Sequence, residues 1–151
     1  MRYIVLILFM FFTNTNIHAQ THSTYDSVLA KKLNADEYGM KKYILVILKT
    51  GPVSITDKTR LDSIFNGHMK NIQALASQNK LVLAGPLGKN EKNYEGIFVL
   101  NTESMNEAKK MLDGDPAVHA GVLAAELYLW YGSAAIQEVT GIHDKIQRTH
   151  F

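Results

Sequence analysis

The sequence predicts an α+β domain in which two helices pack on one face of a four-stranded antiparallel sheet. The chain has 151 residues, of which 46% are hydrophobic and 20% are charged, a balance typical of one globular domain. Segments with strand or helix periodicity follow one another in residues 43–48, 56–79, 81–84, 96–100, 104–114 and 125–131. Their order, β-α-β-β-α-β, is that of the ferredoxin-like fold.

The first strand and the first helix carry the clearest patterns. Residues 43–48 are apolar at every position and are closed by Gly51-Pro52, which indicates a central strand covered on both faces. Thr56-Asp57 then offers a helix start. The apolar residues that follow at helical spacing are Leu61, Ile64, Phe65, Met69, Ile72, Leu75 and Ala76. We therefore expect this helix to end near residue 79.

The remaining elements follow from turn and capping signals. Residues 81–84 and 96–100 are joined by a polar loop, which favours a hairpin. Ser104 and Glu107 have the spacing of a capping box, and Gly114 ends the helix that they begin. The last strand, residues 125–131, is rich in apolar and aromatic side chains.

A sheet with helices on one face leaves its other face bare. The strands supply more large apolar side chains than one covered face needs, namely Tyr43, Leu45, Ile47, Phe98, Leu127, Tyr128 and Trp130. An apolar area of that size is unfavourable for a monomer in water. We therefore expect a homodimer in which two chains close an α/β barrel.

The N-terminus has the layout of a secretory signal peptide. Arg2 precedes a short apolar run, and Ala19 is a suitable residue before the cleavage site. The run is about half of the roughly 20 residues that a membrane-spanning helix needs, so a permanent anchor is the weaker interpretation. The predicted organisation is a signal peptide (1–19), an N-terminal extension (20–41), the domain (42–139) and a C-terminal tail (140–151). We expect a periplasmic or secreted protein with no membrane contact after cleavage.

Charge and cysteine content exclude several classes of function. Cleavage would remove one basic residue and no acidic one, leaving 15 basic against 14 acidic residues and a net charge of +1. Such a balance gives no electrostatic case for binding nucleic acid. The chain has no Cys, so it has no disulfide framework and no thiolate nucleophile. We predict no metal and no cofactor.

Two residues are candidates for chemistry. His68 occupies the apolar face of the first helix, between Phe65 and Ile72. Asp115 lies on a stiff turn, because Gly114 ends a helix and Pro116 restricts the residue before it to extended conformations. Taken singly, His68 can be a core histidine satisfied by one hydrogen bond, and Asp115 a plain turn residue.

A wider pattern links these two residues. His68-Met69 is followed by Ala84-Gly85-Pro86 after the second strand and then by residues 115–121, which read Asp-Pro-Ala-Val-His-Ala-Gly. Together with the order of elements from about residue 42 to residue 130, this pattern resembles the YCII family. The resemblance implies a dimeric α/β barrel in which the helix His and the Asp line one pocket.

The same resemblance implies a function. By the resemblance, His68 and Asp115 would form an acid-base pair, and we expect Gly85, Pro86, Pro116 and His119 to border the substrate. A carboxylate that accepts from one ring nitrogen fixes the imidazole tautomer and leaves the other nitrogen free for a substrate proton. Some family members are lyases or dehydrochlorinases. We therefore expect a small-molecule enzyme of the lyase type, and the alternative is a dimeric binding module without catalysis.

Overall fold

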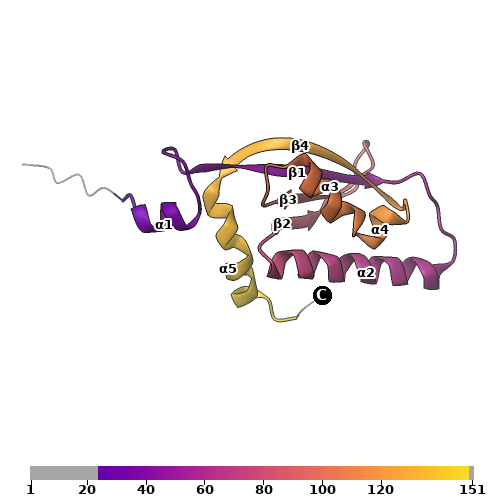
Figure 1. Ribbon diagram of the computed structural model, residues 1–151. Helices are drawn as coiled ribbons and strands as arrows, with labels where there is room; N and C mark the ends of the chain where they lie inside the picture. The colour runs from indigo at the N-terminus through magenta and orange to yellow at the C-terminus, as the bar shows by residue number, and fades with distance from the viewer. Residues whose placement is uncertain (1–23, 150–151) are drawn as a thin grey trace, which may run out of the picture.

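The sheet has four antiparallel strands in the order β2-β3-β1-β4 (Figure 1). The strands are β1 (Met40–Thr50), β2 (Leu81–Pro86), β3 (Tyr94–Leu100) and β4 (Leu123–Ser133). This computed structural model describes residues 24–149, so the predicted signal peptide lies outside the described residues. The order and directions of the strands confirm the predicted ferredoxin-like α+β fold.

The strands are longer than their apolar segments. β1 and β4 pair along their whole length, from Met40 opposite Ser133 to Thr50 opposite Leu123. The ladder therefore extends past the predicted segments at both ends, and one of these ends contributes Leu123 to the core. β2 continues through Gly85 and Pro86, and proline is tolerated there because β2 is an edge strand.

Helices α2 (Lys58–Ser77), α3 (Met105–Asp113) and α4 (Pro116–His119) lie on one face of the sheet (Figure 1). The side chain of Asp57 caps α2 by accepting from the N–H of Arg60 at 3.2 Å, and Ser104 caps α3 by accepting from Glu107 N–H at 3.3 Å. The short helix α4 was not predicted. It forms because Pro116 has the backbone angle of a first helical residue and gives up no needed N–H.

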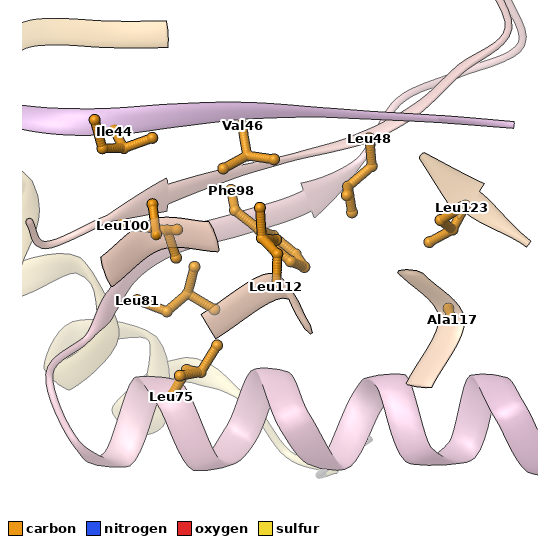
Figure 2. Packing of buried hydrophobic residues seen from close by; sticks show 11 residues of the cluster. Ile44, Val46, Leu48, Leu75, Leu81, Phe98, Leu100, Leu112, Ala117 and Leu123 are labelled. Atoms are coloured by element: carbon orange, nitrogen blue, oxygen red, sulfur yellow. The ribbon is translucent and has the colours of Figure 1, made fainter. Parts of the chain in front are cut away.

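The main core lies between these helices and the sheet (Figure 2). Ile44, Val46 and Leu48 alternate along β1 toward the helices and are at most 3% exposed. They pack against residues from every neighbouring element, including Leu75, Phe98, Leu100, Leu112, Ala117 and Leu123. The core therefore joins α2, α3 and α4 to all four strands.

The opposite face of the sheet carries a second apolar cluster. Tyr43, Leu45 and Ile47 of β1 point to this side, opposite Trp130, Tyr128 and Glu126 of β4. Tyr43 is buried beneath Trp130, whereas Tyr128 is 49% exposed. Helices α2, α3 and α4 leave this face uncovered (Figure 1), and Ile136, which follows β4, packs against one part of the cluster. Phe98 and Leu127, which are paired with Val46, belong to the helix-covered face instead.

Short helices lie at the two ends of the described chain. The N-terminal extension contains α1 (Ser27–Lys32), which is capped by the side chain of Asp26. β4 is followed by the 3-10 helix η1 (Ala134–Glu138) and then by α5 (Val139–Ile146). Within residues 24–149, no helix has the length and apolar character needed to cross a membrane.

Candidate functional site

The side chains of His68 and Asp115 meet between α2 and α4. Nδ1 of His68 lies 2.9 Å from Oδ1 and 2.8 Å from Oδ2 of Asp115. The side chain of Asp115 is completely buried, and His68 is only 8% exposed. Two residues far apart in the sequence therefore form one buried hydrogen-bonded pair.

Asp115 is held by the start of the helix that follows it. As the N-cap of α4, it has an extended backbone, and its Oδ1 accepts from the N–H groups of Ala117 at 2.9 Å and Val118 at 3.2 Å. Its other oxygen, Oδ2, accepts from Nδ2 of Asn71 at 3.0 Å. Each carboxylate oxygen thus has a donor in addition to the imidazole.

These contacts decide the charge of Asp115. Burial is the largest single influence and by itself raises the pKa of the carboxyl group. Hydrogen bonds from His68, Asn71 and the Val118 N–H, together with the charge of His68, act in the opposite direction and outweigh burial. The pKa of Asp115 therefore lies below its usual value of 3.8, and the group is ionised at neutral pH.

The imidazole is positioned by close packing of α2 on α4. Gly67 faces the ring of Pro116 so closely that a Cβ at position 67 would lie 2.8 Å from Pro116 Cγ. The His68 ring stacks on Phe98 of β3 with a centroid distance of 5.8 Å and an interplanar angle of 20°. Phe65, one turn earlier in α2, meets the ring edge-on at 6.1 Å.

The pairing also fixes the two nitrogens of His68 in different roles. Nδ1 faces the ionised carboxylate and donates to it, so Nε2 is the nitrogen left for other partners. In the described part of the chain, no buried side-chain nitrogen or oxygen lacks a hydrogen-bond partner. Nε2, which makes no hydrogen bond among these residues, therefore keeps contact with the open space beside it.

That open space is a groove between α2 and the edge of the sheet, with a volume of about 1570 Å³. His68 borders it, together with Phe65, Phe98, Gly85 and Pro86. Asp115 does not border it, because the carboxylate lies behind the imidazole. Of the predicted substrate-binding residues, the structure thus places Gly85 and Pro86 beside His68.

Pro116 and His119 have other positions. Pro116 packs against Gly67 behind the pair and does not line the groove. His119 is exposed at the end of α4 and does not line it either. A direct role of these two residues in binding a substrate stays a prediction.

A comparison with protein families gives a match over most of the ordered domain. The sequence profile of the YCII-related domain matches residues 42–130, from the start of β1 to the end of the apolar part of β4. The chain belongs to the YCII family. The match includes both His68 and Asp115.

Comparisons with individual proteins add less. No curated protein matches this YCII chain. Among solved structures, it is similar to 5-chloro-2-hydroxyhydroquinone dehydrochlorinase (TftG) from Burkholderia phenoliruptrix AC1100, in complex with 2,5-dihydroxybenzoquinone. The identity is 25%, the TM-score is 0.42, and the similarity covers 58% of this chain and 92% of the other.

The YCII domain also shows two site residues that the sequence analysis missed. Asn71 follows His68 by three positions and so lies on the same face of α2, which was a usable signal. Phe98 gave no such signal, because its stacking on His68 depends on how β3 lies beneath α2. Within residues 24–149, no three His, Asp or Glu side chains are grouped so that they could hold a metal ion.

Proposed function

We propose that this YCII protein binds a small ring compound beside His68 and acts on it by acid-base chemistry. The observation that carries the proposal is the division of roles on one imidazole: Nδ1 is held by Asp115, and Nε2 is left to the groove. This is the arrangement that a general base requires. A carbonyl-bearing or halogenated ring is the class of compound that we propose.

In the proposed reaction, Nε2 of His68 removes a proton from a C–H or O–H group of the bound ring. The electron pair left behind moves into the ring and expels a leaving group such as chloride, so the overall step is an elimination. The ionised carboxylate of Asp115 stabilises the imidazolium that forms. His68 then returns the proton to solvent, and no covalent intermediate is needed.

The aromatic surroundings of His68 favour a second candidate function, a binding module without turnover. Phe65 is partly exposed and provides a flat apolar surface beside the imidazole, which suits a planar ligand. Nε2 could then hold such a ligand by a single hydrogen bond. Binding and catalysis therefore use the same residues and differ only in whether a proton moves.

The experiment that separates the two compares binding and turnover for a panel of small carbonyl and halogenated ring compounds. The native protein, His68→Ala and the control Lys70→Ala are assayed side by side, since Lys70 is exposed on the same helix. Turnover that is lost in His68→Ala and kept in Lys70→Ala supports catalysis. Binding without turnover in any variant supports the binding module, and no binding at all rules out both.

We also propose that the protein is exported and works as a homodimer. Export is supported by the signal-peptide layout of residues 1–19. Dimerisation is supported by the apolar side chains on the open face of the sheet, among them Leu45, Tyr128 and Trp130. Size-exclusion chromatography with light scattering, and mass spectrometry of the mature N-terminus, test these two proposals.

A further inference from the structure

The groove beside His68 extends well past the imidazole. Its α2 wall is formed by residues at helical spacing from Phe65 to Ser77, a rise of about 18 Å. The facing wall is the whole of β2, Leu81–Pro86, which spans about 17 Å. The two independent spans agree, so the groove is much longer than a single substituted ring.

The end of the groove farthest from Pro86 is closed by elements that follow the sheet. Val139, Thr140 and His143 of α5 border it, as does Gln137 of η1. These residues lie beyond the region that matches the YCII family, which ends at residue 130. This far wall is therefore contributed by a segment outside the family match.

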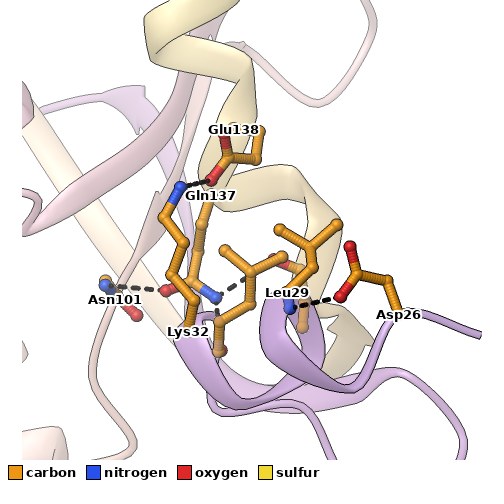
Figure 3. A network of polar contacts seen from close by, with 8 residues as sticks. Asp26, Leu29, Lys32, Asn101, Gln137 and Glu138 are labelled. Carbon is orange, nitrogen blue, oxygen red and sulfur yellow. Dashed lines mark hydrogen bonds and ion pairs between the residues drawn. The ribbon is translucent and has the colours of Figure 1, made fainter.

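The far wall is fixed to the rest of the domain by hydrogen bonds (Figure 3). Nε2 of Gln137 donates to the carbonyl of Leu33 at 2.7 Å. Oε1 of Gln137 accepts from Nζ of Lys41 at 3.2 Å. Lys32 and Glu138 form an ion pair of 2.8 Å that joins α1 to η1. These contacts attach η1 to α1 and β1.

The chemical character of the groove changes along its length. Past His68, the lining is more apolar than polar: Ile72 and Ala76 on α2 and Leu81 and Leu83 on β2 border the groove, together with the polar Gln73 and Ser77. At the far end, Lys32 forms an ion pair with Glu138 and Asp144 accepts from Gln147 at 3.0 Å, and Glu95 lines the opposite end. Apolar walls favour an uncharged chain, and an anionic group of a ligand would be repelled by Asp144 at the far end.

We propose that the ligand of this protein is elongated, with a polar ring at His68 and an uncharged apolar chain that lies along β2 toward α5. This inference rests on the proposed function for the position of the ring at His68. It adds that the ring carries an uncharged apolar chain. The volume of about 1570 Å³ supports it, because pockets for drug-sized ligands are typically about 300–1000 Å³.

The test uses the methyl, butyl and heptyl esters of 4-hydroxybenzoic acid as probes in isothermal titration calorimetry. Burying one methylene group strengthens binding by about fourfold at most, so we expect the heptyl ester to bind at least about tenfold more tightly than the methyl ester. Ala76→Phe should remove this dependence on chain length by filling the groove. Ala74→Phe is the matched control, because Ala74 is exposed on the same helix and does not line the groove.

A second pair of variants tests the far wall separately, in case Ala76→Phe fails to fold. Val139→Trp should weaken the heptyl ester selectively, whereas Ile142→Trp, on the part of α5 that does not line the groove, should not. His68→Ala should weaken all three esters by the same factor. If affinity still rises with ester chain length in both Ala76→Phe and Val139→Trp, the chain binds elsewhere and the inference is overturned.

The outcomes separate this inference from the proposed function. If the methyl ester binds in a His68-dependent way but a longer chain adds nothing, the elongated ligand is refuted and the proposed function stands. If no ester binds, or if binding is independent of His68, the proposed function fails for this class of ring and the inference fails with it.

Discussion

At the scale of single residues, the site depends on a carboxylate that stays ionised although it is buried. Asp115 collects donors from a side chain on α2, from backbone N–H groups of α4 and from His68. A buried charge with so many partners is stable only while all of them are present, because each lost donor leaves part of the charge unsatisfied. The pair and its surroundings should therefore respond to small chemical changes.

Replacing Asp115 by Asn should lower the free energy of unfolding by about 1–3 kcal/mol at pH 7, since an uncharged amide oxygen accepts less well than a carboxylate that has four donors. The folded-state pKa of Asp115 lies below 3.8, so its stabilisation is complete above about pH 4 and is lost as pH falls through the folded pKa. The difference between native protein and variant should therefore shrink in acid. Urea unfolding from pH 7 to pH 2.5 measures it.

The control for this experiment is Asp62→Asn. Asp62 is exposed on α2 and pairs with Lys58 across one turn, an arrangement that adds little stability. Its variant should follow the native pH curve. If Asp115→Asn also followed that curve, the buried pair would contribute nothing to pH-dependent stability.

Asn71 offers a second test at this scale. Asn71→Ala removes one hydrogen bond to Asp115 and should cost about 1 kcal/mol of stability. Asn71→Asp instead brings a second carboxylate to within about 3 Å of the first, and like charges at that distance are strongly unfavourable. We expect Asn71→Asp to be less stable than Asn71→Ala at pH 7 and the gap to narrow as the pH falls toward about 4, because the repulsion raises a carboxyl pKa in the folded state. Equal stabilities at pH 7 would show that residue 71 turns away from Asp115.

At the scale of elements, the site is a product of the close approach between α2 and α4. Gly67 allows Pro116 to approach the helix, and Pro116 in turn starts the helix whose N-cap is Asp115. The residues before and after the reacting pair thus set the distance between His68 and its carboxylate.

Gly67→Ala should be destabilising although alanine is the better helix former. Alanine gains about 1 kcal/mol of helix propensity, but its Cβ would lie 2.8 Å from Pro116 Cγ, and such overpacking costs about 1–3 kcal/mol. Gly141→Ala in α5 is the matched control, because a Cβ there meets nothing within 4 Å. Thermal unfolding should show a lower midpoint for Gly67→Ala and an equal or higher one for Gly141→Ala. A higher midpoint for both would mean that α4 moves away freely.

At the scale of the whole molecule, the sheet has two unlike faces. The helix-covered face holds the main core, and the other face presents Leu45, Ile47 and Tyr128 around the buried Tyr43. The Lys49–Glu126 ion pair lies on the same open face. A mostly apolar face of this kind suits a second copy of the chain, which is the basis of the proposed homodimer.

Tyr128→Glu should therefore convert a dimer into a monomer, because it places a charge in the centre of the open face. Leu129→Glu is the control, since Leu129 is exposed on the same strand but points to the other side of the sheet. Sedimentation velocity of both variants and of the native protein at micromolar concentration gives the answer. A monomeric native protein would refute the proposed dimer.

Much of the fold was predictable because its signals are local. The apolar run of β1, the cap at Asp57 and the capping box at Ser104 are read from neighbouring residues, and each produced the expected element. His68 on the buried side of α2 followed from helical spacing in the same way. The predicted ends of the strands were less accurate. β1 and β4 continue past their apolar segments because the two strands hydrogen-bond to each other along their whole length.

The sequence by itself determined the order of elements, the buried position of His68 and the stiff backbone at Asp115, because periodicity and proline chemistry act over a few residues. Only the tertiary structure decided that Asn71 and Phe98 join the pair, that Pro116 lies behind it, and that α5 closes a long groove. Those facts depend on how separate elements pack, and packing brings together residues whose spacing along the chain carries no record of the contact.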